Sequence, residues 1–396
     1  MDRSAMQASE KGAIEAVRTS PARADRSRAE VSPGFASWLI RHRVGLVCSS
    51  FQAGQLLFFG ADSGGHVVST ATKIAGVMGV AAFSQRLYLA DRTRIWRFEN
   101  ALRPREVIEG RFDRLFVTRN AQVTGYVATH EVAVAPSGRI IFTSAKYACL
   151  ATISTTHAFK AIWKPPFISK LAPEDRCHLN GVAMEGERVR YVTTCATTDI
   201  VDGWRDHRRD GVVVIDVETD RILVEGLSMP HSPRLHGGAV WVDDAGSGHL
   251  CRIDPQTGRR ENVAFCPGFL RGLTFVGSYA VLTASLPRYG RFQGLPLDDE
   301  MARRKAHPWC GVFVIDLRSG DLAEWIRLGS EYTELVDVAL IPNVRCPMAL
   351  EPDTPQMQDA ITFEDECAVA KPAVGPVQGA GADAGSVPVA QLRCGV

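Results

Sequence analysis

Three of the ten histidines in this 396-residue chain, His130, His178 and His231, stand at equivalent points of a weak internal repeat and lie about 50 residues apart. Neutral imidazoles are good ligands for Zn²⁺, Fe²⁺ and similar divalent ions, and three of them leave open positions for water or substrate. If the fold gathers these side chains around one axis, they form a metal site. The sequence therefore predicts His130, His178 and His231 as ligands of a divalent metal cofactor.

Further reactive side chains lie in the same or equivalent segments. Glu131 is a candidate general base or an orienting partner of a ligand, and Asn180 joins the same candidate catalytic set. Arg234 and Arg271 carry planar guanidinium groups that suit a substrate carboxylate or phosphate. Together with the three histidines, these residue types predict a metal-dependent hydrolase, lyase or epimerase that acts on a small anionic or sugar-like substrate. The alternative is a non-catalytic propeller scaffold that binds a ligand or a protein, in which these groups satisfy one another and water.

The elements that must position these residues are strands. Short runs rich in Val, Ile, Phe and Tyr recur through the middle of the chain and are bounded by turn dipeptides such as Ser137-Gly138 and Ser319-Gly320. Helical periodicity is confined to residues 34–42 and 297–305. Because no amphipathic helices separate the strands, the pattern favours a closed or sandwiched all-β fold over a parallel α/β sheet.

A weak internal repeat specifies the architecture further. Six segments share a small or polar pair followed by an apolar residue: Met78-Gly79-Val80, His130-Glu131-Val132, Asn180-Gly181-Val182, Pro233-Arg234-Leu235, Arg271-Gly272-Leu273 and Val336-Asp337-Val338. Dividing residues 45–344 by six gives 50 residues per unit, which is close to the period of a four-stranded blade. The sequence predicts a six-bladed β-propeller in which residues 337–342 close the ring against residues 45–59. Seven blades or a pair of β-sandwiches are compatible with the same irregular spacing.

Composition divides the chain and excludes several classes. Residues 1–33 and 348–396 lack a periodic apolar pattern and are predicted to be a disordered leader and a low-complexity tail around a propeller domain of residues 34–347. The balance of 45 Lys and Arg against 44 Asp and Glu argues against a nucleic-acid partner, and no apolar run is long enough for a membrane helix. Ten cysteines without a C-x-x-C pair indicate reduced thiols in a cytoplasmic protein. The expected partner is a small-molecule ligand.

Several motifs resemble a bacterial family of conserved hypothetical proteins. They are Phe35-x-x-Trp38-Leu39, Ser50-Phe51-Gln52-Ala53-Gly54-Gln55-Leu56, Thr129-His130-Glu131, His178-Leu179-Asn180-Gly181-Val182, Ser232-Pro233-Arg234, Arg271-Gly272-Leu273 and Cys310-Gly311-Val312, in this order over residues 35–347. The resemblance implies the same domain limits and channel residues, and no established activity. A looser likeness connects the chain with six-bladed metalloenzymes such as gluconolactonase-type lactonases and the peptidyl-hydroxyglycine lyase. The histidine-rich ring is closer to the lyase type, since the lactonase site is rich in acids and Asn.

Overall fold

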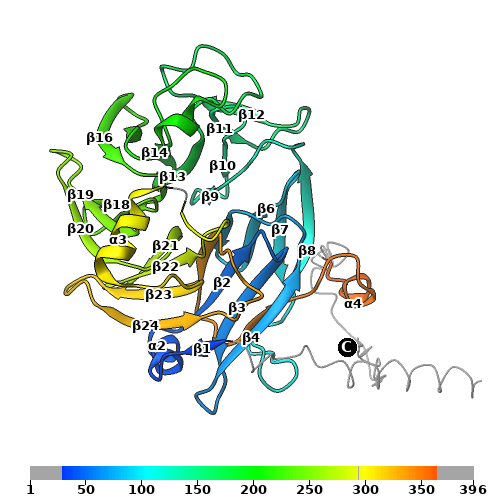
Figure 1. Cartoon of the computed structure of the whole chain (residues 1–396). Coiled ribbons are helices and arrows are strands. Elements are labelled where there is room, and N and C mark those ends of the chain that lie inside the picture. Colours follow the sequence, from blue (N-terminus) through cyan, green and yellow to red (C-terminus); the bar gives the residue numbers. More distant parts are fainter. Residues whose placement is uncertain (1–28, 293, 364–396) are drawn as a thin grey trace, which may run out of the picture. The chain divides into compact units, whose positions relative to one another are not determined.

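A computed structural model describes residues 29–292 and 294–363. In this part of the chain the fold is all-β: six sheets are arranged as the blades of a propeller within residues 29–352 (Figure 1). The predicted six-bladed β-propeller is therefore confirmed. Residues 353–363 belong to a separate unit and carry the short helix α4 (Pro355–Asp359).

Each blade is an antiparallel sheet of four strands, and two blades carry an extra outer strand. Blade 1 is β25 (Asp337–Pro342), β2 (Val44–Ser50), β3 (Gln55–Ala61) and β4 (Val67–Lys73); blade 2 is β5 (Val80–Phe83), β6 (Arg86–Ala90), β7 (Arg94–Asn100) and β8 (Arg114–Val123), with β26 (Pro347–Ala349) outside. Blade 3 is β9 (Val132–Val134), β10 (Ile140–Ser144), β11 (Cys149–Thr152) and β12 (Lys160–Trp163); blade 4 is β13 (Leu179–Glu185), β14 (Arg188–Thr194), β15 (Val212–Asp216) and β16 (Arg221–Leu227). Blade 5 is β17 (Pro230–His236), β18 (Ala239–Asp244), β19 (His249–Ile253) and β20 (Arg260–Phe265); blade 6 is β21 (Phe269–Val276), β22 (Tyr279–Ser285), β23 (Gly311–Asp316) and β24 (Leu322–Arg327), with β1 (Glu30–Val31) outside.

Both predicted helices are present. Helix α2 (Phe35–His42) buries Phe35, Trp38 and Leu39, whose spacing places them on one face, and it ends at Arg43, which adopts a left-handed conformation. Helix α3 (Pro296–Arg304) begins with a proline in its first turn, and a short 3₁₀ helix, η1 (Gly203–His207), lies between β14 and β15.

The ring closes as the sequence predicts. Strand β25, from the C-terminal end of the propeller, pairs antiparallel with β2, and Leu340 lies opposite Leu46. This pairing completes blade 1 with strands from both ends of the domain, which removes the exposed edges that an open sheet would leave.

The six repeated segments lie on the innermost strands of the six blades or immediately before them, where neighbouring blades approach one another. All three of their glycines, Gly79, Gly181 and Gly272, have no room for a side chain. A Cβ at Gly181 would lie 2.3 Å from Pro233, and one at Gly272, whose φ is +61°, would lie 2.6 Å from the Asp337 backbone. The small residues of the repeat thus allow the inner strands to pack closely around the axis.

Ordered structure extends beyond the predicted bounds of 34–347 on both sides. Strand β1 pairs with β24, and β26 pairs with β8. The rest of the predicted leader and tail, residues 1–28 and 364–396, lies outside the described residues. Of the cysteines within the described ranges, all eight are buried and free of disulfides. In the same ranges, no helix has both the length and the apolar character to cross a membrane, and a cytoplasmic location stays a prediction.

Candidate functional site

A pocket of about 620 Å³ opens at one end of the propeller axis. Its wall includes His130 and His178, which precede β9 and β13, and His231 and Arg271, which lie on β17 and β21. Four of the seven predicted site residues therefore lie in one cavity, although they come from four different blades. This convergence is the geometric condition on which the predicted site depends.

The three histidines are neighbours. The ring centroid of His130 lies 4.7 Å from that of His178 and 6.4 Å from that of His231. A residue with a positive φ lies at or near each histidine. His178 itself has a φ of 51°, and Ala128 and Met229, which have a positive φ, stand two residues before His130 and His231, respectively. Such backbone conformations cost energy in non-glycine residues and concentrate at functional sites.

His178 forms a carboxylate–imidazole pair with Asp175. Its Nδ1 lies 3.0 Å from both carboxylate oxygens of Asp175, and the indole nitrogen of Trp204 donates to Oδ2 of the same carboxylate at 3.0 Å. The Trp204 ring also stacks on the imidazole, with centroids 4.2 Å apart. An Nδ1–H that is donated to a carboxylate leaves Nε2 as the basic nitrogen, and two partners hold the ring in one orientation.

His130 and His231 are held in the neutral form. Burial, together with the charge of nearby His178 and Arg271, lowers the pKa of His130 well below its ordinary value. Burial and the Arg271 charge do the same to the pKa of His231. His231 donates Nδ1–H to the Met229 carbonyl at 2.8 Å, while the amide of Asn180 lies 3.5 Å from its Nε2.

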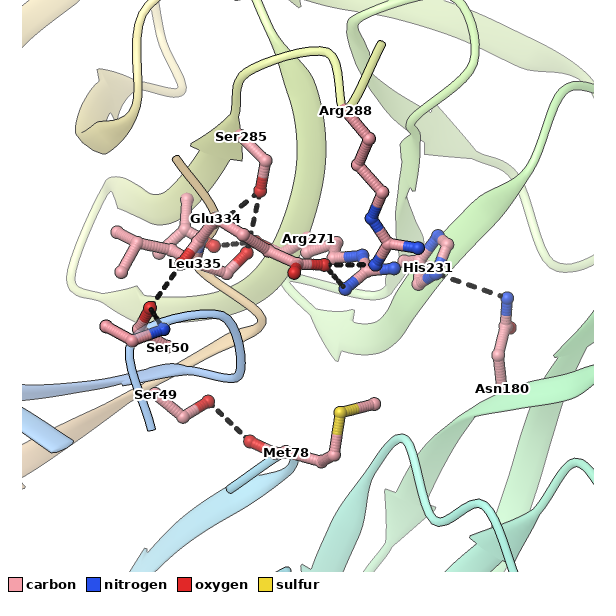
Figure 2. Close-up of polar contacts among 12 residues, drawn as sticks. Ser49, Ser50, Met78, Asn180, His231, Arg271, Ser285, Arg288, Glu334 and Leu335 are labelled. Atoms are coloured by element: carbon pink, nitrogen blue, oxygen red, sulfur yellow. Dashed lines mark hydrogen bonds and ion pairs between the residues drawn. The ribbon is translucent and has the colours of Figure 1, made fainter. Parts of the chain in front are cut away.

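Two guanidinium groups meet on one carboxylate at the pocket wall (Figure 2). Oε1 of Glu334 accepts from Arg271 at 2.8 Å and from Arg288 at 2.5 Å. Nε of Arg271 is buried without a hydrogen-bond partner in the described structure, and burial lowers the pKa of this guanidinium. One negative charge between two positive charges leaves a net cation, which fits the predicted anion-binding role of Arg271.

Glu131 and Arg234 occupy a position that the sequence did not suggest. They do not line the pocket; their side chains form an ion pair, and Oε2 of Glu131 accepts from the Val182 amide at 2.9 Å. Glu131 is only 3% exposed. Asn180 is also absent from the pocket wall, where it supports His231 from behind and accepts from Thr193 at 2.7 Å. These three residues therefore lie behind the pocket wall, where they contact the interior of the propeller instead of the cavity.

Two more buried carboxylates approach the Glu131–Arg234 pair. The Asp337 carboxylate accepts from the Val80 amide at 2.8 Å, and burial and Glu131 raise the pKa of Asp337 to about 7. Asp243 is fully buried, and neither of its carboxylate oxygens has a hydrogen-bond partner in the described structure. Burial raises the pKa of Asp243 well above its ordinary value, while the nearby Arg234 charge opposes that rise. We call Glu131, Arg234, Asp243 and Asp337 the axial charge cluster.

Replacement of Asp243 by asparagine should change how stability depends on pH. From about pH 4 upward the unfolded chain loses the Asp243 proton while the folded chain retains it, so ionisation favours unfolding of the parent protein. An asparagine side chain cannot ionise, and D243N should gain stability relative to the parent by up to about 1.4 kcal/mol for each pH unit until the folded pKa is reached. Urea unfolding at pH 5, 6, 7 and 8 measures this difference.

Asp254 provides a control of opposite sign. Backbone amides of Thr257 and Gln256 lower the pKa of this exposed carboxylate. D254N should therefore lose stability relative to the parent as the pH rises through the acid range. If the difference in the free energy of unfolding between D243N and the parent stays constant with pH, the folded chain does not retain a proton on Asp243, and the prediction is wrong.

The part of the chain that the structure describes does not contain a complete set of side chains arranged as metal ligands. Within residues 29–292 and 294–363, no group of three or more His, Cys, Asp or Glu side chains is arranged to hold a metal ion. Nδ1 of His178 faces Asp175, and Nδ1 of His231 faces the Met229 carbonyl. The divalent metal stays a prediction.

Three site residues were not among the predicted catalytic or metal-binding residues: Asp175, Arg288 and Glu334. Asp175 had a detectable signal, since an acid three residues before a candidate histidine can orient its ring. Arg288 lies in the segment between β22 and β23, whose unusual length is a signal of a functional loop, but length alone does not show that Arg288 reaches Glu334. Trp204, in the loop between β14 and β15, reaches the pocket through its contact with His178.

Comparison with known proteins identifies the family. Residues 33–350 match the model described as "Domain of unknown function (DUF4915)". The chain belongs to the DUF4915 family. This confirms the resemblance to a family without an established activity, and the matched range covers all six blades of the DUF4915 chain.

The curated proteins gave no match to the DUF4915 chain. Similar solved structures include one described as a nidogen/laminin complex, with 14% identity, a TM-score of 0.49, and coverage of 76% of this chain and 98% of that one. A protein of unknown function from Bacteroides caccae shows 11% identity, a TM-score of 0.44, and coverage of 75% and 98%. A streptogramin B lyase shows 14% identity, a TM-score of 0.36, and coverage of 70% and 74%.

Proposed function

We propose that this DUF4915 propeller is an enzyme that removes a proton from a small anionic substrate bound in the pocket at the end of the axis. The reaction class is that of lyases and epimerases, in which a C–H bond next to a carboxylate breaks. The Asp175–His178 pair in the pocket wall carries this proposal, because a carboxylate-oriented imidazole is a general base suited to neutral pH.

The side chains around the Asp175–His178 pair suit both parts of the reaction, which are removal of the proton and stabilisation of the negative charge that remains. Nε2 of His178 takes the proton, and the electron pair left on carbon spreads onto the substrate carboxylate. Arg271 and Arg288 hold that carboxylate and stabilise its growing negative charge. Return of a proton to the other face of the carbon gives epimerisation, whereas departure of a neighbouring group as an anion gives elimination.

The neutral state of His130 supports the same assignment. Its ring lies against His178, and its Nδ1 is buried without a hydrogen-bond partner in the described structure. A charged imidazole at this position would repel the protonated form of His178, and burial keeps His130 uncharged. A neutral ring beside the base therefore leaves His178 free to accept a proton.

Proton exchange tests the proposal even while the product is unidentified. The purified chain is incubated in D₂O with a panel of 2-hydroxy acids and uronic acids, and loss of the C–H signal next to the carboxylate is followed by proton NMR. The parent protein should catalyse exchange in at least one acid, and H178N should lower the rate by about 10²–10⁴-fold, the usual contribution of a general base.

A histidine outside the pocket supplies the matched control. His66 is 77% exposed in the loop between β3 and β4, and H66N should exchange at the parent rate. The proposal fails if an acid binds with an affinity that depends on Arg271 and yet shows no exchange in D₂O. That result would favour the non-catalytic binding scaffold.

A further inference from the structure

The pocket wall carries more positive charge than a single carboxylate requires. Six arginines line it: Arg92, Arg205, Arg208, Arg271, Arg288 and Arg291. The lining carboxylates Asp91, Asp175 and Glu334 number half as many, and two of them are occupied elsewhere. Asp91 accepts from the Trp96 indole at 2.8 Å and from backbone amides, and Asp175 accepts from Trp204 and faces His178. Because the whole chain is nearly neutral, at +1, this excess is a local feature of the pocket.

Three of these arginines are supported by aromatic rings. The guanidinium carbon of Arg92 lies 5.0 Å from the Phe51 ring centroid, that of Arg205 lies 4.5 Å from Trp204, and that of Arg271 lies 5.6 Å from Phe269. We call Arg92, Arg205 and Arg271 the stacked arginines. Stacking restrains the plane of a guanidinium, and the ion pair of Arg205 with Oδ1 of Asp202, at 3.1 Å, restrains that side chain further.

The stacked arginines come from alternate blades. Arg92 lies in the turn between β6 and β7 of blade 2, Arg205 lies in η1 of blade 4, and Arg271 lies on β21 of blade 6. In a six-bladed ring, positions on alternate blades approach the axis from three directions. One carboxylate or phosphate at Arg271 therefore leaves the other two stacked arginines facing the cavity without an anion from the ligand.

We infer that the ligand is a small polyanion, with two or three carboxylate or phosphate groups held apart by its carbon skeleton. This inference rests on the proposed function, since it specifies the substrate class of the same pocket. A cavity of about 620 Å³ is large enough for a molecule of this size, and its concave wall fits a small ligand better than an extended charged surface. Arg271 and Arg288 hold the anionic group next to the reacting carbon, and Arg92 and Arg205 hold the distal groups.

A series with matched carbon skeletons tests the number of anionic groups. Butyrate, glutarate and propane-1,2,3-tricarboxylate carry one, two and three carboxylates, and orthophosphate and tripolyphosphate provide the phosphate equivalents. Isothermal titration calorimetry at pH 7.5 and low salt should show affinity rising by about tenfold for each added group, because each gains a charge-assisted hydrogen bond. The series with the steeper rise identifies the anionic group of the natural ligand.

Charge-neutral variants assign the distal groups. R92Q and R205Q should each weaken binding of the tricarboxylate by about tenfold and leave butyrate binding unchanged, whereas R271Q should weaken both. R188Q serves as the control, since Arg188 is 67% exposed, pairs with Glu218 and lies outside the pocket. Equal affinity across both series, or tricarboxylate binding that is insensitive to R92Q and R205Q, would overturn the inference.

The outcomes separate this inference from the proposed reaction. If a monoanionic acid undergoes His178-dependent exchange in D₂O while the affinity series is flat, the reaction stands and the polyanion is excluded. If affinity rises with charge while no tightly bound acid exchanges, the pocket is a polyanion-binding site and the proposed proton transfer is excluded.

Discussion

Replacement of Arg234 by methionine should lower the free energy of unfolding by about 3–5 kcal/mol, the usual cost of removing one partner from a buried ion pair. Arg234 is the cation of the axial charge cluster, and it pairs with Glu131, which is 3% exposed. The variant would leave that carboxylate buried without its counter-charge beside Asp243 and Asp337. Urea unfolding at pH 7.5, followed by circular dichroism, measures the loss.

A double-mutant cycle separates the ion pair from simple loss of packing. R234M and E131Q should each destabilise the protein, and the combined variant should lose clearly less than the sum of the two, because neither partner then remains as an unpaired charge. The control is R188M, which removes an exposed arginine from blade 4 and should change the free energy of unfolding by less than about 1 kcal/mol. Additive losses in the cycle would contradict the coupling of Arg234 to Glu131.

Replacement of Asp175 by asparagine should slow exchange of the substrate proton by about 10²–10⁴-fold, the range expected for a base that has lost its orienting partner. Both oxygens of Asp175 lie 3.0 Å from Nδ1 of His178, so the carboxylate holds the imidazole with Nε2 as its basic nitrogen. An amide can present its NH₂ to the ring and favour the opposite tautomer. The rate constant kcat for exchange, measured by NMR in D₂O, reports this change.

The split between kcat and KM distinguishes a positioning role from a structural one. Asp175 orients the His178 ring, whereas Arg271 and Arg288 would hold the substrate, so D175N should lower kcat and leave KM nearly unchanged. W204F keeps the ring stack and removes the indole donor to Asp175, and it should have a smaller effect in the same assay. An unchanged kcat in D175N, or a loss of activity that is matched by a fall in melting temperature, would contradict the assignment.

Much of the fold could be predicted because its signals are local. Alternating apolar runs and turn dipeptides predict strands, and six repeated segments at intervals near 50 residues predict blades. The repeat also locates the inner strands, because glycines such as Gly181 and Gly272 occur where neighbouring backbones leave no space for a Cβ. Closure of the ring by β25 and β2 follows from the same pattern.

The sequence by itself determined the propeller and the set of polar residues that stand at the starts of its inner strands. Only the tertiary structure decided which of these face the pocket and which face the interior. His130 and Glu131 are neighbours in the segment just before β9, yet His130 lines the cavity while Glu131 pairs with Arg234 away from the pocket wall. The partners of His178 and Arg271 come from loops whose course depends on contacts between blades, and spacing along the chain does not encode those contacts.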